Sequence, residues 1–432
     1  MDEQVLILVV AFVVIVASNA PIAIALGVCA LLALLSLGTL PACYMMAQRM
    51  TTGVASFPLL AIPFFVLAGL LMGEGGMARR LVDFATAVAG QFKGGLAYIT
   101  TITCMMFGAI SGSATAALSS IGGIMIPEMT RNGYDRRFAV ALTTSASTTG
   151  LVIPPSNIMI VYAVVTGNVS VAAMFLAGVL PGIAVGLAIM AACALMFRGQ
   201  QVGTVAPFAW GRVVATGLGA LPSMLLIVIV LGGILGGVFS PTEAAAITVL
   251  YAFLLAVVFY REIKLAQLPA LLLRTGITTA VIFLLIATSQ ALAWVLASEQ
   301  IPQAISAALL SLSDNPLVIL MLVNILLLAV GAVMDMTPAV LIFTPIFLPV
   351  VTKLGMHPVQ FGIMMIVNLC IGLCTPPVGT CLFVGCGVGK TTIAEVTRPM
   401  IPFFLAMFVA LMLTTYWPAL SIWLPTVAGA IE

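Results

Sequence analysis

The chain has 432 residues, of which 63% are hydrophobic and 6% are charged, and its formal net charge at pH 7 is +2. Soluble domains carry roughly 25% charged residues, so this composition excludes a water-soluble globule. Apolar stretches of about 20 residues recur along the chain and predict an all-α polytopic membrane protein. The expected partner is therefore the lipid bilayer, and the small net charge gives no reason to expect nucleic acid.

The apolar stretches predict a series of membrane crossings joined by short polar links. The first residues are acidic and lack both a basic segment and a small-residue cleavage site, so we expect the first stretch to be a membrane helix rather than a signal peptide. The predicted crossings are 2–18, 20–38, 54–73, 138–165, 171–197, 218–238, 241–260, 275–297, 359–388 and 400–428.

Two further apolar segments, 96–127 and 316–350, carry polar residues near the middle. We interpret each as a re-entrant helical hairpin, which enters the membrane and returns on the same side. Irregular backbone at that depth is tolerated only where it is buried in protein or lines a watery cavity. A short segment at 79–90 precedes the first hairpin, and we expect it to lie along the membrane surface. The matching stretch at 301–312 is uncharged but equally short.

Two crossings, 138–165 and 359–388, contain adjacent prolines, in the sequences GLVIPPSNIM and GLCTPPVGTC. A proline removes one helical hydrogen bond and crowds the carbonyl four residues earlier. Both crossings are therefore predicted to be broken helices with freed carbonyls, including those of Gly150 and Gly372. An unpaired carbonyl in the bilayer costs several kcal/mol, so a small hard cation with oxygen ligands is predicted at the breaks.

The second half of the chain repeats landmarks of the first half. The proline pair at 376–377 lies 222 residues after the pair at 154–155. GAISGSATAAL, at 108–118, aligns within one residue of this offset with GAVMDMTPAVL, at 331–341. Several landmarks at one offset indicate an internal repeat.

The distribution of positive charge predicts the orientation of the two halves. If the loop at 39–53 lies outside, every Lys and Arg except Arg49 and Lys353 falls in links on the inner side, as the positive-inside rule requires. Five predicted crossings separate this loop from the matching link at 261–274, so the repeat is inverted, which is typical of secondary transporters. The alternative is duplicated helix packing without a site. The two predicted units are 1–210 and 211–432, each with scaffold helices, one hairpin and one broken helix.

The hairpin tips and the breaks carry the oxygen atoms that we predict to bind the cation. Glycine and small hydroxyl residues permit a tight reversal and offer ligands. Asp335 is an acid inside a membrane segment, which predicts either cation binding or proton transfer. The alternative for each hydroxyl group is a hydrogen bond to its own helix. The predicted cation ligands are Ser111, Gly112, Ser113, Gly150, Pro154, Asp335, Thr337, Gly372, Thr375, Pro376 and Gly379.

An anionic substrate group suits the same place. The helices that follow the two tips begin near residues 113 and 337, so their positive dipole ends point at the centre. The predicted substrate contacts are Thr115, Ser147, Thr149, Ser156, Asn157 and Thr380. Glu243 is a further candidate, although Ser240 and Glu243 have the spacing of a helix-capping box.

Other motifs argue against an ATP-driven pump or an enzyme. GCGVGKTT, at 385–392, follows Val384 where a phosphate-binding loop needs glycine. AISG, at 109–112, resembles a serine protease motif, but the only imidazole base, His357, lies in a predicted outer link. One histidine excludes a multi-histidine metal site, and the eight cysteines form no C-x-x-C pair.

Several long segments are specific enough to compare with a known family. They are LLAIPFFVLAGLLMGEGGMARRLVDFATAVAG, FGAISGSATAALSSIGGIMIPEM, TTSASTTGLVIPPSNIMIVYAV, FSPTEAAAITVLYA, and MDMTPAVLIFTPIFLPV followed by CTPPVGTCLFV. They closely resemble the large membrane subunit of TRAP (tripartite ATP-independent periplasmic) transporters, and the resemblance spans nearly the whole chain. It implies an elevator-type protein of the bacterial inner membrane, similar to the ion-transporter superfamily, in which the hairpins and broken helices move against a scaffold. It also implies sodium-driven import of an organic anion, such as a C4-dicarboxylate or a sialic acid, with a four-helix small membrane subunit and a periplasmic substrate-binding protein as partners.

The resemblance further implies two Na⁺ sites. The first would combine residues 111–113 with the break at 150–157, and the second would combine 335–337 with 374–380. The second tip has Asp335 where the first has no acid, so the two sites are expected to differ. The alternatives are a binding-protein-independent sodium- or proton-coupled carboxylate transporter or exchanger, and an ion channel.

Overall fold

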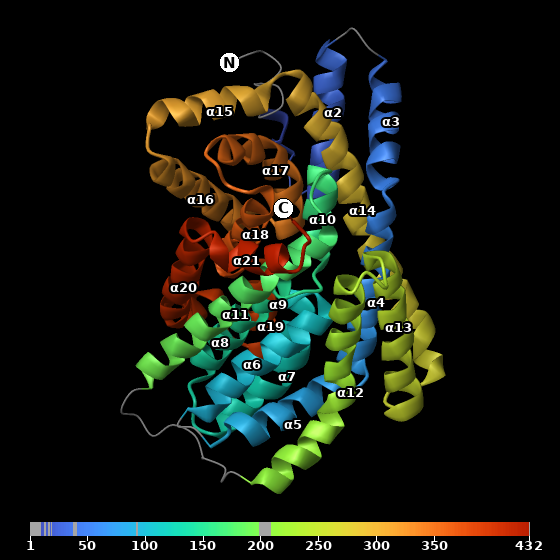
Figure 1. Ribbon diagram of the computed structural model, residues 1–432, viewed down its shortest axis with the longest axis vertical. Helices are drawn as coiled ribbons and strands as arrows, with labels where there is room; N and C mark the ends of the chain where they lie inside the picture. Colours follow the sequence, from blue (N-terminus) through green and yellow to red (C-terminus); the bar gives the residue numbers. More distant parts are fainter. Residues whose placement is uncertain are drawn as a thin grey trace.

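All regular elements in the described part of the chain are helical (Figure 1). The computed structural model describes residues 10–12, 14–15, 18, 20–37, 41–91, 94–197 and 209–431. Eight helices within these ranges are long and apolar enough to cross a membrane, or nine if a bent pair of helices counts as one span. The predicted all-α polytopic architecture is confirmed, whereas most of the first predicted crossing, 2–18, lies outside the described residues.

The two halves of the chain contain similar series of elements. The first half contains α2 (Ile22–Leu37), α3 (Ala42–Val54), η1 (Phe57–Leu60), α4 (Ala61–Glu74), α5 (Met77–Ala89), α6 (Gly95–Ser111), α7 (Ala114–Arg131), α8 (Arg136–Ser147), α9 (Thr149–Val152), α10 (Asn157–Thr166) and α11 (Val171–Met196). The second half contains α12 (Trp210–Leu235), α13 (Pro241–Phe253), η2 (Leu254–Phe259), η3 (Leu265–Gln267), α14 (Leu268–Ser298), α15 (Ile301–Leu312), α16 (Pro316–Val333), α17 (Met336–Lys353), α18 (Pro358–Cys374), α19 (Thr380–Gly389), α20 (Ile393–Tyr416) and α21 (Ala419–Val427).

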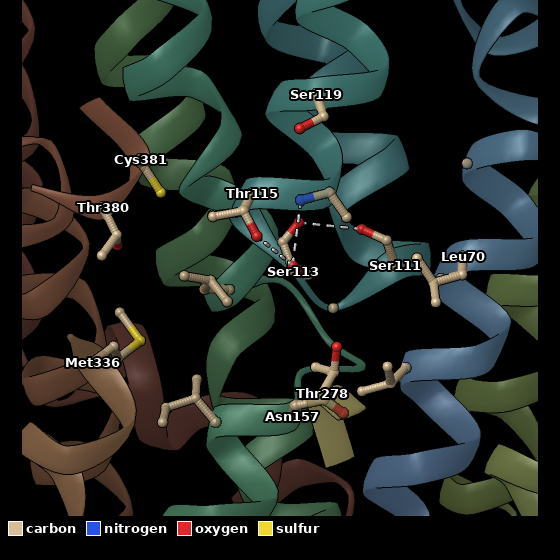
Figure 2. A pocket seen from close by; sticks show the side chains of 18 of the residues that line it. Leu70, Ser111, Ser113, Thr115, Ser119, Asn157, Thr278, Met336, Thr380 and Cys381 are labelled. Atoms are coloured by element: carbon tan, nitrogen blue, oxygen red, sulfur yellow. Dashed lines mark hydrogen bonds between the residues drawn. The ribbon is translucent and has the colours of Figure 1, made fainter. Parts of the chain in front are cut away.

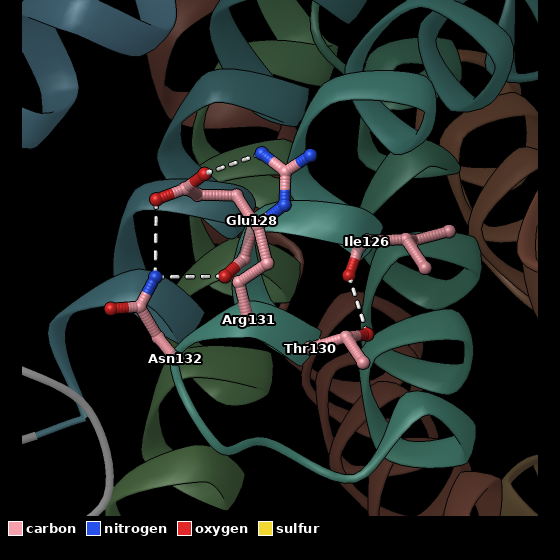
Figure 3. Close-up of polar contacts among 5 residues, drawn as sticks. All are labelled: Ile126, Glu128, Thr130, Arg131 and Asn132. Carbon is pink, nitrogen blue, oxygen red and sulfur yellow. Dashed lines mark hydrogen bonds and ion pairs between the residues drawn. The ribbon is translucent and has the colours of Figure 1, made fainter.

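The first predicted hairpin consists of α6 and α7, joined by a turn at Gly112 and Ser113. Gly112 has a φ of +60°, a left-handed conformation that glycine adopts without steric cost. Ser113 caps α7, because its hydroxyl oxygen accepts a hydrogen bond from the Ala116 N–H at 3.3 Å (Figure 2). At its other end α7 stops at Asn132, whose side-chain amide donates to the carbonyl oxygen of Glu128 at 2.8 Å (Figure 3).

The second predicted hairpin consists of α16 and α17, and its turn lies at Met334 and Asp335. Asn315 caps the start of α16 by accepting a hydrogen bond from the Leu317 N–H at 3.0 Å. Asp335 occupies the N-cap position of α17. The tip of the second hairpin therefore carries a carboxylate where the tip of the first carries glycine and serine.

Both predicted broken crossings are interrupted helices. The first continues from α8 and α9 into α10, with a bend of 45°, and the second continues from α18 into α19. Residues 153–156 and 375–379 are non-helical, and each of these stretches contains a cis peptide bond between its two prolines.

Each hairpin contacts its broken helix through two glycines. A Cβ atom on Gly108 of α6 would lie 2.4 Å from the Cα atom of Gly150, and one on Gly372 would lie 2.6 Å from the Cα atom of Gly331 in α16. The two backbones therefore approach too closely for any side chain. The same contact in both halves agrees with the internal repeat, while the opposite orientation of the halves and the division into 1–210 and 211–432 stay predictions.

The helices form two packed groups (Figure 1). In one group, α2, α3 and α4 pack against the long helix α14, and α13 packs against α4. In the other, both hairpins pack against α8, α9, α18 and α19. The segment predicted to lie along the membrane surface and its matching stretch are the separate helices α5 and α15, which lie at opposite ends of the molecule (Figure 1).

Two predicted boundaries are wrong. The predicted outer loop at 39–53 is largely the helix α3, because this stretch contains helix-forming alanine, methionine, glutamine and arginine and packs against α14. The predicted crossing at 400–428 is divided between α20 and α21. Trp417 lies before Pro418 and adopts φ −117° and ψ 87°, since a residue before proline avoids the helical conformation.

Candidate ion and substrate site

One cavity of about 630 Å³ lies between both hairpin tips, both interrupted helices and the helices α4 and α14. Figure 2 shows Thr380 and Met336, from the second half, on the opposite side of this cavity from Ser111 and Leu70. Sequence positions more than 200 residues apart therefore share one space. The predicted site residues that line it are Ser111, Gly112, Ser113, Thr115, Asn157, Asp335, Thr337 and Thr380.

The hydroxyl groups of the first tip bind the turn itself. Ser113 Oγ lies 3.2 Å from Thr115 Oγ1, and Ser111 Oγ donates to the Ser113 carbonyl at 3.4 Å (Figure 2). A Cβ atom on Gly112 would lie 3.1 Å from the Pro155 carbonyl oxygen, so the tip rests against the first break. This packing brings hydroxyl and carbonyl oxygens together at one place.

The hydroxyl groups beside the first break donate to their own helix. Ser147 donates to the Thr144 carbonyl at 2.8 Å, and Thr149 donates to the Ala146 carbonyl at 2.6 Å. This is the alternative that the sequence left open for each hydroxyl, although each oxygen keeps lone pairs as an acceptor.

Other side-chain oxygens near the first break are buried without a hydrogen-bond partner, among them those of Ser145, Ser156 and Asn157. A buried polar atom left unsatisfied costs about 1–3 kcal/mol, so these oxygens fit a bound cation or a polar substrate group. Asn157 also lines the cavity directly.

The second tip and the second break are joined by hydrogen bonds. Thr380 donates its hydroxyl to Asp335 Oδ1 at 3.1 Å, and the Val378 N–H donates to the carbonyl oxygen of Ala332 at 3.1 Å. The three ion pairs formed by described residues do not include Asp335. A carboxylate that lines a cavity without a basic partner suits a cation.

One predicted free carbonyl is already in use. The Gly372 carbonyl accepts a hydrogen bond from the Thr375 N–H at 2.9 Å, because the chain turns immediately after α18 and brings this N–H back towards the helix. The Thr375 hydroxyl donates to the Ile371 carbonyl at 2.7 Å. The prediction that the second proline pair leaves the Gly372 carbonyl unpaired is therefore wrong.

Several predicted residues lie behind the cavity wall rather than on it. Gly150 and Gly372 serve the close contacts between hairpins and broken helices described above. The predicted residues that do not line the cavity are Gly150, Pro154, Ser147, Thr149, Ser156, Gly372, Thr375, Pro376 and Gly379. Their roles as ion or substrate ligands stay predictions.

The set of candidate ligands favours a hard cation. Among the described residues, no group of three or more His, Cys, Asp or Glu side chains converges as a metal site. The cavity instead offers hydroxyl, amide and carbonyl oxygens and the Asp335 carboxylate. Such oxygen ligands suit alkali and alkaline-earth ions better than zinc or copper.

Sequence reasoning missed the ion pair between Glu74 and Arg274, which lines the cavity from the other group of helices. The two side chains are 42% and 59% exposed, so the pair lies where the cavity meets solvent. In the sequence, the only indication of this ion pair was that both residues lie near the ends of apolar stretches. Glu243, by contrast, is a helix cap: the Ser240 N–H donates to it at 2.7 Å and the Glu243 N–H donates to Ser240 Oγ at 3.3 Å.

Interrupted helices and hairpins that meet around a polar cavity are features of membrane transport proteins. A crystal structure of the YdaH transporter from Alcanivorax borkumensis has the same fold, with a TM-score of 0.62 and 14% identity over 90% of this chain and 89% of that one.

Residues 9–420 match the family described as "Tripartite ATP-independent periplasmic transporter, DctM component". The chain is 46% identical over 416 residues to protein YgiK of Salmonella typhimurium, covering 96% of this chain and 95% of YgiK. It is 41% identical over 373 residues to the C4-dicarboxylate TRAP transporter large permease protein DctM of Pseudomonas aeruginosa, covering 86% and 87%. The chain belongs to the DctM family of TRAP transporter large permeases, as the sequence resemblance implied.

Proposed function

We propose that this permease imports an organic anion of the C4-dicarboxylate or sialic acid class, driven by a sodium gradient. The names of relatives cover both substrate classes. The anion would be delivered by a periplasmic binding protein and would cross the bacterial inner membrane with the help of a small four-helix membrane subunit. The single observation that carries this proposal is the cavity between the two hairpins and the two breaks.

The cavity has features that suit an anion. The first turns of α7, α10, α17 and α19 all contribute to its wall, through Thr115, Asn157, Thr337 and Thr380 among others. The N-terminus of a helix carries a partial positive charge and free N–H groups, so four such ends around one space favour a carboxylate. No basic side chain is needed at the centre for this attraction.

The same cavity has features that suit cations. We propose a first Na⁺ site between residues 111–113 and the first break, and a second between residues 335–337 and the second break. The buried oxygens of Ser156 and Asn157, which have no hydrogen-bond partner, support the first site. The Asp335 carboxylate, which accepts a hydrogen bond from Thr380 but forms none of the three ion pairs of the described residues, supports the second. Bound sodium supplies positive charge beside the anion, which couples the two binding events.

The packing of the helices supports an elevator movement. Each hairpin is joined to its broken helix by a glycine contact, so the hairpins and breaks can move together as a transport domain. The group around α14 then acts as the scaffold. The inverted repeat predicted from the charge pattern supplies the two related arrangements that such a movement needs.

The experiment is uptake by the chain and its small subunit in proteoliposomes, with radiolabelled succinate or N-acetylneuraminate and the corresponding binding protein. We expect uptake to require an inward sodium gradient and to fall at least tenfold in Asp335→Asn. Asp314→Asn, an exposed acid before α16, is the matched control. Full uptake without sodium, or normal sodium dependence in Asp335→Asn, would refute the proposed coupling.

A further inference from the structure

A second cavity, of about 420 Å³, lies between the two groups of helices and away from the central one. Its wall comes from α3, from the stretch before η1, and from α10 and α14. The residues that line it are Arg49, Thr52, Gly53, Ser56, Val164, Gln290, Ala293 and Trp294.

Arg49 is the charged group of this cavity. Its guanidinium carbon lies 5.1 Å from the centroid of the Trp294 ring, and its Nε–H is buried without a hydrogen-bond partner. None of the three ion pairs found in the described ranges involves Arg49. A guanidinium held over an aromatic face keeps its in-plane N–H groups free, and these fit the two oxygens of a carboxylate.

Two neutral polar side chains lie beside the guanidinium. Gln290 packs so closely on α3 that a Cβ atom at Gly53 would lie 2.7 Å from its Cβ and Cγ atoms. Glycine at this position therefore lets Gln290 reach the cavity. Ser56 precedes η1, and its hydroxyl makes no capping hydrogen bond. An amide and a hydroxyl next to a guanidinium add donors for a carboxylate.

The helix α14 lines both cavities, at different points along its length. Arg274, Thr278 and Ile282 contribute to the central cavity, and Gln290, Ala293 and Trp294 contribute to the second. Since an α-helix rises 1.5 Å per residue, the eight residues from Ile282 to Gln290 separate the two cavities by about 12 Å.

The helix α10 connects the same two cavities from the other group of helices. It begins at the central cavity with Asn157 and reaches the second cavity with Val164. These seven residues span about 10 Å along the helix axis. The second cavity therefore lies close to the central site along α10. Arg49 is one of the two basic residues that the charge pattern of the sequence places on the outer side of the membrane.

We propose that Arg49, with Gln290, Ser56 and Trp294, forms an outer anion site on the scaffold that takes a carboxylate of the transported solute before it enters the central cavity. This inference rests on the proposed function. Each of the two cavities is then lined by one arginine of the scaffold. Arg49 of α3 lines the outer cavity, and Arg274 of α14 lines the central cavity.

The test compares Arg49→Gln with Arg212→Gln, which removes an exposed positive charge from α12. Uptake of succinate or N-acetylneuraminate is measured in proteoliposomes against the concentration of loaded binding protein. Loss of a charge-assisted bidentate contact is expected to raise the KM of Arg49→Gln about tenfold or more. We expect an unchanged maximal rate and sodium affinity, while Arg49→Lys restores uptake only partly.

Two further measurements separate the possible outcomes. Gln290→Leu keeps the size of the side chain and is expected to raise KM in the same direction, by less than Arg49→Gln. Docking of the binding protein to the permease is measured for both variants. The inference would be overturned if Arg49→Gln had the same KM as Arg212→Gln. It would also be overturned if Arg49→Gln weakened docking of the binding protein by the same factor as it raised KM, because Arg49 would then bind a carboxylate of the binding protein. Sodium-driven uptake by the unchanged chain tests the proposed function separately.

Discussion

The glycine contact between α6 and α9 leads to a sharp prediction about stability and ion binding. A Cβ atom on Gly108 would lie 2.4 Å from the Gly150 Cα, whereas ordinary contacts begin at 3.4 Å. Gly108→Ala must therefore separate the first hairpin from its broken helix by about 1 Å. Overpacking of this kind costs about 1–3 kcal/mol, and here both contacting groups are backbone, which cannot rotate away.

The displacement also reaches the proposed sodium site. Gly108 lies one helical turn before Ser111 and the turn at 112–113, so the tip moves with it. A misplacement of about 1 Å can lower the rate of a well-oriented process about 100-fold. We expect Gly108→Ala to lower the melting temperature, to lose most of its stabilisation by sodium and to reduce uptake to about 1% of the wild-type rate.

The control is Gly123→Ala on the other helix of the same hairpin. Beyond the backbone of its own helix, no atom lies within 4 Å of the added methyl group, and alanine stabilises a helix by about 0.5–1 kcal/mol relative to glycine. Melting is followed in detergent with and without sodium, because a ligand stabilises a fold in proportion to RT ln(1 + [L]/Kd). Equal melting curves and equal uptake in the two variants would refute the reasoning.

Two other predictions concern the connections around α18. The buried Tyr162 hydroxyl donates to the Pro358 carbonyl at 2.6 Å, so Tyr162→Phe is expected to lose about 1 kcal/mol of stability. The control is Tyr44→Phe, which changes an exposed tyrosine. Equal melting temperatures for the two variants would contradict this prediction. Burial lowers the pKa of His357 below its ordinary value of 6.5, and the neutral ring accepts a hydrogen bond at the start of α18 through Nδ1, at 3.2 Å. The stability that this cap contributes is complete above pH 6.5 and is lost as the pH falls through the lower pKa of the folded chain. His357→Asn keeps a capping group but removes the titrating ring, so the melting temperature of this variant is expected to fall less between about pH 7 and pH 5. If the melting temperature of His357→Asn fell as much as that of the unchanged chain, the ring would not have this role.

The interrupted helices and the hairpins could be predicted because their causes are local. Adjacent prolines cannot continue a helix, and the glycine and serine residues at 111–113 permit a reversal that larger residues resist. Asp335 was identified for a similar reason, since an acid within an apolar stretch needs an explanation. These features depend on neighbouring residues in the chain, and the structure contains them at the predicted positions.

The features that the sequence did not predict depend on contacts between distant segments. The helix α3 carries polar residues at positions 48, 49, 51 and 52 and packs against α14. The ion pair of Glu74 and Arg274 joins helices that are far apart in sequence. The Gly372 carbonyl, which was expected to be free, is an exception, because its donor, the Thr375 N–H, lies only three residues further along the chain. For α3 and for the ion pair, the decisive partner is set by the fold rather than by adjacent residues.

The two hairpin tips bring unequal charge to one cavity, and this has a consequence for the proposed coupling. The first tip offers only neutral oxygens, so a cation bound there would keep its charge, whereas Asp335 would offset the charge of a cation at the second tip. An anion attracted by the surrounding helix ends would then interact more strongly with the first cation than with the second. Because coupling between two ligands is reciprocal, the anion would raise sodium affinity mainly at the first tip. The second cation, held by a carboxylate of the protein itself, would depend less on the transported solute and would bind even when the cavity holds no anion.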